Sequence, residues 1–85
     1  MEVKNISAVV FDDSKSYESR ELISGFEGSP WFKKIIFTDN HRQMENLIAS
    51  EQAQLGIIIN NDFAAKIKSR TPVEIQVIVD GRQTN

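Results

Sequence analysis

The 85-residue chain has no cysteine, only two prolines and four glycines, and no uninterrupted apolar run long enough to cross a membrane. The absence of cysteine excludes a disulfide framework, a thiol nucleophile and a cysteine-based zinc site. The apolar stretch of a secretory signal peptide is missing as well. Taken by itself, the sequence therefore predicts a soluble cytoplasmic domain, unless it is an excised piece of a longer protein.

Neither sign of charge dominates, since 10 lysines and arginines face 12 aspartates and glutamates, for a formal net charge of −2. The basic residues are scattered, so the electrostatic footprint of a nucleic-acid-binding protein is absent. Hydrophobic residues make up 40% of the chain and charged residues 26%, which is typical of a globular domain. We expect residues 1–85 to form one soluble domain that does not bind nucleic acid.

Four segments have the patterns of β-strands. The apolar runs at residues 6–11 and 55–59 predict central strands that are buried on both faces. Residues 32–38 carry two lysines and residues 73–80 alternate between apolar and polar, so both predict edge strands. In the last segment the apolar side chains are expected on one face and the opposite face mostly in water. The two sets are Val73, Ile75, Val77 and Val79 on the first face, and Glu74, Gln76 and Ile78 on the second.

Three amphipathic segments between these strands predict helices. Ser16 and Asn40 are candidate N-caps, and residues 60–62 offer caps for the third, shorter helix. The first helix should end near residues 25–28, where Gly28 precedes Ser29-Pro30. The residues expected to be buried are Leu22, Ile23 and Phe26 in the first helix, Met44, Leu47 and Ile48 in the second, and Phe63 and Ile67 in the third.

The element order predicts an α/β fold, β-α-β-α-β-α-β, with the helices packed on a small four-stranded sheet. Right-handed crossovers and the two apolar central strands favour the spatial order 2-1-3-4 in a mostly parallel sheet. The direction of the fourth strand stays open, because an antiparallel fourth strand is compatible with the sequence.

Aspartates follow three of the predicted strands: Asp12 and Asp13, Asp39, and Asp80. The carboxyl ends of parallel strands are where open α/β sheets bind ligands, and paired carboxylates there can hold Mg²⁺. One hypothesis is therefore a free-standing cytoplasmic receiver-like or phosphatase-like domain that uses Asp12 and Asp13 with Mg²⁺. The other interpretation, which we favour, is that these side chains accept hydrogen bonds in turns and at helix caps. No catalytic, cofactor-binding or metal-ligating residue is assigned.

Two further side chains have the chemistry of functional residues. His41, the only histidine, stands in the first turn of a predicted helix and is expected to be an ordinary surface residue. Trp31 is expected to pack a loop onto the core, with an exposed contact role as the alternative. Neither a nucleophile elbow nor a glycine loop after the first strand is present, so no motif indicates an enzyme.

Several short motifs follow one another along the chain. An apolar strand ending in acidic residues and serine is followed by a Ser-Arg-x-Leu helix and, at the end, by Val-Asp-Gly-x-x-x-Asn. The segments concerned are residues 9–16, 19–23, 29–32, 46–48, 55–63 and 77–85. This ordered set resembles the extracytoplasmic domain of ABC-2 type transporter permeases. Asn60 and Asn61 replace prolines that the family usually has, and Ser50-Glu51 replaces a glycine.

The resemblance implies a non-catalytic piece of a bacterial or archaeal cell-membrane exporter, without a cofactor. It would lie in the periplasm or outside the cell, joined to the membrane by flanking helices that this chain lacks. The parent permease would form a dimer and would work with a separate ATP-binding subunit that hydrolyses ATP. A third hypothesis, independent of the resemblance, is a protein-binding domain that uses its fourth strand as an open edge.

Overall fold

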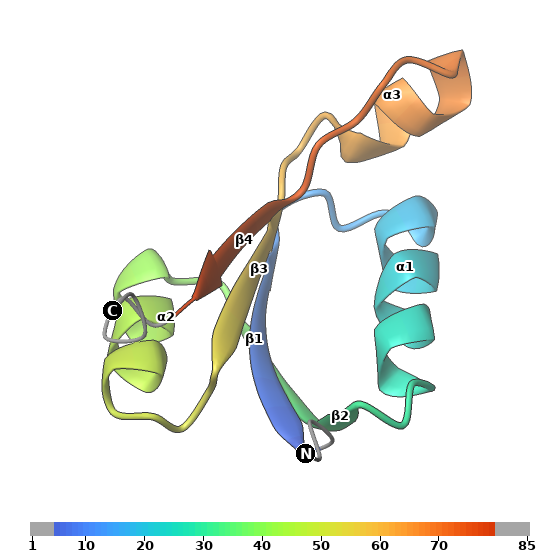
Figure 1. Cartoon of the computed structure of the whole chain (residues 1–85). Helices are drawn as coiled ribbons and strands as arrows, with labels where there is room; N and C mark the ends of the chain where they lie inside the picture. The colour runs from blue at the N-terminus through green and yellow to red at the C-terminus, as the bar shows by residue number, and fades with distance from the viewer. Residues whose placement is uncertain (1–4, 80–85) are drawn as a thin grey trace.

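The computed structural model describes residues 5–79 as a four-stranded sheet with helices on both faces (Figure 1). The strands are β1 (Ile6–Asp12), β2 (Phe32–Thr38), β3 (Leu55–Ile59) and β4 (Gln76–Val79). The helices are α1 (Tyr17–Glu27), α2 (His41–Ala49) and α3 (Phe63–Ser69). Within this part of the chain no helix is both long and apolar enough to cross a membrane.

The strand order is β2-β1-β3-β4, so the predicted fold class and spatial order are confirmed. Strand β1 runs parallel to both β2 and β3, whereas β4 runs antiparallel to β3. The direction of the fourth strand, which the sequence left open, is thereby settled. Val79, the last residue of β4, pairs with Leu55, the first residue of β3. Strand β4 therefore ends at the end of the sheet where the three parallel strands begin.

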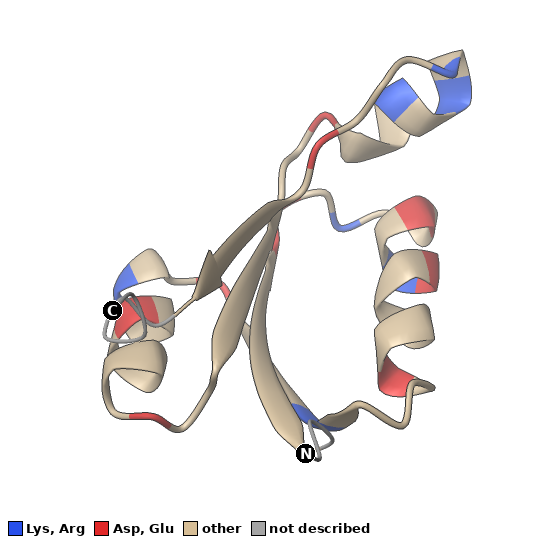
Figure 2. Cartoon of the chain, in the orientation of Figure 1, with Lys and Arg blue, Asp and Glu red and all other residues tan. Residues whose placement is uncertain are grey.

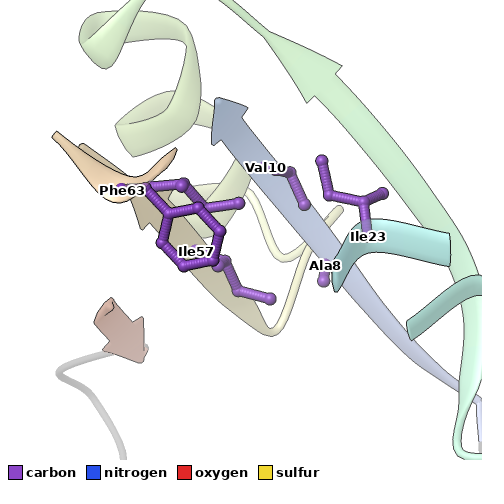
Figure 3. Close-up of a cluster of buried hydrophobic side chains, with 6 residues drawn as sticks. Ala8, Val10, Ile23, Ile57 and Phe63 are labelled. Carbon is purple, nitrogen blue, oxygen red and sulfur yellow. The ribbon is translucent and has the colours of Figure 1, made fainter. Parts of the chain in front are cut away.

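Two apolar layers lie on opposite faces of the sheet, because the residues of β1 and β3 alternate between the faces. On one face α1 and α3 pack onto a buried cluster drawn in Figure 3. On the other face α2 covers a second cluster. The first cluster comprises Ala8, Val10, Ile23, Ile57, Ile59 and Phe63, and the second comprises Val9, Met44, Ile48, Ala53 and Ile58.

The first two helices begin at the predicted N-caps. The Ser16 hydroxyl accepts a hydrogen bond from the backbone N–H of Ser19, and the Ser19 side chain pairs with the backbone N–H of Ser16. The Asn40 side chain accepts from the N–H of Gln43. The third helix also begins within the predicted residues, with Asp62 at the N-cap position, but the Asp62 side chain makes no capping hydrogen bond and pairs instead with Lys66 one turn later, at 3.1 Å.

The predicted bounds of the last strand require correction, and its expected apolar face is buried only in part, since Val73 and Ile75 pack against the first cluster whereas the later valines are exposed. The strand was expected over residues 73–80, but β4 contains only four residues, and Asp80 lies outside the described part of the chain. Val77 and Val79 are 56% and 59% exposed, whereas Ile78, expected on the wet face, packs against the cluster under α2. Ile78 is covered because α2 packs on its face of the sheet. The two valines stay exposed because the short α3 reaches the opposite face only through Phe63, its single buried residue.

Two side chains expected in the core are exposed. Ile67 is 42% exposed, because α3 has only seven residues and touches the core through its first one. Trp31 is 46% exposed. Its main chain is held against β1 by a 3.0 Å hydrogen bond from the N–H of Ile6 to its carbonyl oxygen, so the backbone is fixed although about half of the residue is exposed.

Candidate functional site

A hollow of about 470 Å³ opens at the carboxyl ends of β1 and β2. This is the edge of an α/β sheet at which ligands usually bind. The residues around it come from both strands, from the loop after β1 and from the start of α2. They are Val10, Asp12, Lys15, Phe37, Thr38, Asp39 and Gln43.

The Asp12 carboxylate organises the loop between β1 and α1. One oxygen, Oδ1, accepts hydrogen bonds from the backbone N–H groups of Ser14 and Lys15, both at 3.0 Å. The other, Oδ2, accepts one from the Ser19 hydroxyl at 2.7 Å. Both oxygens are thus engaged in closing the turn, which is the role favoured for a strand-end aspartate on sequence grounds.

Ser19 is the partner that sequence reasoning missed. It is fully buried, and its hydroxyl bonds to Asp12 as well as to the carbonyl oxygen of Ser16. The only signal in the sequence was the Ser-x-x-Ser spacing, which is a variant of the capping box. That spacing indicates a helix start, but it does not indicate that the second serine reaches back to the preceding strand.

Lys15 stands at the opening of the hollow in a left-handed backbone conformation, with φ at 49°. Non-glycine residues adopt this region at a cost, which surrounding contacts must offset. The two N–H bonds to Asp12, one of them from Lys15 itself, hold the turn in this shape. The side chain of Lys15 is exposed, and within residues 5–79 its ammonium group has no carboxylate at ion-pair distance.

The opposite wall is formed by the end of β2 and the start of α2. The Thr38 hydroxyl bonds to the Gln43 side chain and accepts a hydrogen bond from the N–H of Asn40. Phe37 contributes a ring that is 56% exposed. It also borders a second hollow of about 280 Å³, which runs along α1 past Arg20 and Glu27. Together the two hollows present an aromatic surface flanked by charges of both signs.

The structure brings together only some of the predicted strand-end carboxylates. Asp12 and Asp39 line the same hollow, whereas Asp13 does not line it and is fixed through its main chain by a 2.9 Å bond to the carbonyl oxygen of Ile59. Asp80 lies outside the described residues. Among those that are described, no three His, Cys, Asp or Glu side chains gather as metal ligands would. Of the two aspartates named in the receiver-like or phosphatase-like hypothesis, Asp12 lines the hollow and Asp13 does not.

His41 lies outside both hollows. Its ring packs edge-on against Phe11, with the centroids 4.5 Å apart, and the residue is exposed. The expectation that it is a surface residue is confirmed.

Both ends of the described chain lie at the end of the sheet where the parallel strands begin, opposite the hollow at their carboxyl ends. Ile6 begins β1 and pairs with Phe32 at the beginning of β2. Val79 ends β4 beside Leu55, which in turn pairs with Ala8 on its other side. The chain therefore enters and leaves the domain at the same end of the sheet, as it does in domains that are inserted into a loop of another structure.

Comparison with known proteins gives one kind of match. No protein-family model matches the sequence, and no solved structure matches it. The chain is 25% identical over all 85 residues to the "Probable multidrug ABC transporter permease YbhR" of Escherichia coli K12, and equally to the protein of that name in Escherichia coli O157:H7. It spans 23% of the length of these relatives. The similarity relates the chain to a part of an ABC transporter permease.

Proposed function

We propose that this chain is a non-catalytic, extracytoplasmic domain of an ABC exporter permease subunit. The observation that carries the proposal is the shared edge at which Ile6 enters and Val79 leaves the sheet. A folded domain placed between two membrane helices has both chain ends directed at the membrane, and this topology meets that requirement. The similarity to part of a permease over the whole chain supports the same assignment.

The chemistry of the hollow is consistent with contact rather than catalysis. Asp12 accepts two hydrogen bonds from its own loop and one from Ser19 in α1, so its carboxylate stabilises the fold. Phe37, Lys15 and Asp39 offer an aromatic ring and single charges to a neighbouring molecule. In the proposed assembly ATP is hydrolysed by a separate ATP-binding subunit, a second permease copy completes the dimer, and the flanking helices join the domain to the membrane. The domain itself contacts the exported substrate or an outer partner.

The mass and location of the parent protein test the proposal. An antibody raised against the folded 85-residue chain is used to probe fractionated cells of the source organism. We expect a membrane-bound band about four times the mass of the chain, because the chain spans 23% of its relatives. Protease added outside intact spheroplasts should remove that band. A soluble band near 9.7 kDa would contradict the proposal and favour the free-standing receiver-like or phosphatase-like domain.

A further inference from the structure

The ring of Phe37 is shared by the two hollows described above, because Phe37 lines both of them. Val10, its partner on β1, is fully buried. Phe37 lies one strand further out, at the edge of the sheet, and is 56% exposed. Among residues 5–79, no other exposed large apolar side chain lines either hollow. An open aromatic ring on a concave surface favours stacking with the flat ring of another molecule.

Charges of both signs surround this ring, on α1 and on the loop before it (Figure 2). The charged side chains that line the hollows are Lys15 and Asp39 in the first, Arg20 and Glu27 in the second, and Asp12 in both. The Asp12 carboxylate is already engaged by three hydrogen bonds. The other four residues are exposed, and in the described part of the chain none of them lies at ion-pair distance from an opposite charge. The remaining charged residues of α1 and α2 line neither hollow; they are Glu18, Glu21, Arg42 and Glu45.

Each hollow therefore offers one cation and one anion that are not paired with each other, and this arrangement selects a class of ligand. A molecule with only a carboxylate would approach three anionic side chains, Asp12, Asp39 and Glu27. A molecule with only an ammonium group would face the like charges of Lys15 and Arg20. A zwitterion can place its carboxylate at Lys15 and its ammonium group at Asp39. The larger hollow, at about 470 Å³, has the size of a small-molecule site.

We propose that the hollows around Phe37 bind a small aromatic zwitterion, with its ring stacked on Phe37, its carboxylate at Lys15 and its ammonium group at Asp39. The inference deepens the proposed function, on which it rests in making this ligand an exported molecule. The site is open and its ion pairs are exposed to water, so each pair strengthens binding only modestly. We expect dissociation constants on the order of 1 mM for a ligand the size of an amino acid.

A matched set of indole compounds tests the class of ligand. At pH 7, L-tryptophan carries both charges, tryptamine carries only the ammonium group and indole-3-propionate carries only the carboxylate, whereas glycine has both charges and no ring. Each compound is titrated into the nitrogen-15-labelled 85-residue chain, and the amide chemical shifts are followed by NMR. L-Tryptophan should bind about two- to five-fold more tightly than tryptamine or indole-3-propionate. The shift changes should centre on residues 12–15 and 37–43, and glycine should cause none.

Single substitutions assign each part of the ligand to a side chain. Lys15→Gln should remove the advantage of L-tryptophan over tryptamine, and Asp39→Asn its advantage over indole-3-propionate. Phe37→Leu keeps an apolar side chain but removes the ring, so it should weaken the binding of all three indoles several-fold. Asp13→Asn is the matched control, because Asp13 is an exposed aspartate that also follows a strand but lines neither hollow. It should change none of these affinities, and the amide spectrum of each variant shows that it is folded.

Two outcomes would overturn the inference. One is equal affinity of the unsubstituted chain for the three indole compounds, which would mean that the charges do not select a ligand. The other is binding of L-tryptophan that Phe37→Leu leaves unchanged. The cellular location of the parent protein is read separately, so an absence of binding with a membrane-bound parent rejects the site alone. Selective binding of L-tryptophan with a soluble parent of 9.7 kDa supports the site and rejects its role in export.

Discussion

At the scale of single residues, Asp12 has a place both in the fold and in the candidate site, because it holds the loop after β1 and also lines the hollow. Its position after a buried strand is where metal-binding and phospho-accepting aspartates occur in α/β proteins, which made it a candidate from sequence. In the structure its oxygens receive two backbone N–H groups and the Ser19 hydroxyl. A carboxylate used in this way stabilises the loop that presents Lys15 to the hollow.

Replacing Ser19 with alanine tests this role. Ser19→Ala removes the hydroxyl from a fully buried position and leaves Asp12 Oδ2 without its partner. We expect the free energy of unfolding to fall by about 1–3 kcal/mol. Ser24→Ala, at an exposed position of the same helix, should change it by less than about 0.5 kcal/mol. Urea unfolding followed by circular dichroism measures both, and equal effects of the two changes would contradict the role given to Ser19.

Two glycines provide a second test at this scale. A Cβ built on Gly56 would lie 3.0 Å from Met44 Sδ and 3.1 Å from Ile48 Cδ1, so β3 approaches α2 closely at this point. Gly56→Ala should lower the free energy of unfolding by about 1–3 kcal/mol through overpacking. Gly25 lies within α1 and its Cβ would meet nothing within 4 Å.

Gly25→Ala should therefore raise the free energy of unfolding by about 0.5–1 kcal/mol, since alanine is the better helix former. The same unfolding series gives both values. A stabilising Gly56→Ala would show that Met44 moves aside without cost, against the close packing described for α2 and β3.

At the scale of elements, α3 departs most from what periodicity predicts. Phe63 and Ile67 are spaced to share one helix face, yet Phe63 is 5% exposed and Ile67 is 42% exposed. The helix is attached to the core at its first residue and extends away from the sheet (Figure 1), with Lys66 and Lys68 in its last turn. Amphipathic spacing shows which residues share a face, but not how far the neighbouring element extends beneath that face.

Alanine substitutions in α3 should show this asymmetry. Phe63→Ala empties a space in the cluster with Ile57 and Ile59 and should cost about 3–5 kcal/mol of unfolding free energy. Ile67→Ala removes a partly exposed side chain and should cost less than about 1 kcal/mol. Thermal unfolding of the two variants compares them directly. Similar costs would mean that Ile67 is packed in solution and that the sequence expectation for it was right.

The same limit explains which features could be predicted from the sequence. The two apolar strands and the caps at Ser16 and Asn40 are local signals, so the fold class, strand order and helix starts follow from them. Exposure at Trp31 and on β4 depends on what lies across the sheet, which no local pattern contains. Within the site, Asp12 was found because aspartate after a strand is a recognised signal. Ser19 was missed because its contact spans the turn.

At the scale of the whole molecule, the antiparallel β4 has the largest consequence. If the fourth strand were parallel, the chain would end at the same end of the sheet as the hollow. The antiparallel strand instead brings the chain back to the end of the sheet where β1 begins. The hollow then faces away from both chain ends. In a membrane-inserted domain this directs Phe37, Lys15 and Asp39 outward, where an exported molecule or an outer partner can reach them.

The central claim is that this domain lies outside the cytoplasm as part of a permease, and cysteine labelling of the parent protein tests it most directly. Tyr17→Cys places a thiol at a position that is 64% exposed, and Ala8→Cys places one at a fully buried position as the control. In a parent freed of any other cysteines, a membrane-impermeant maleimide added to intact spheroplasts should label Tyr17→Cys. Ala8→Cys should react only after denaturation. Labelling of Tyr17→Cys only after the membrane is permeabilised would contradict the account.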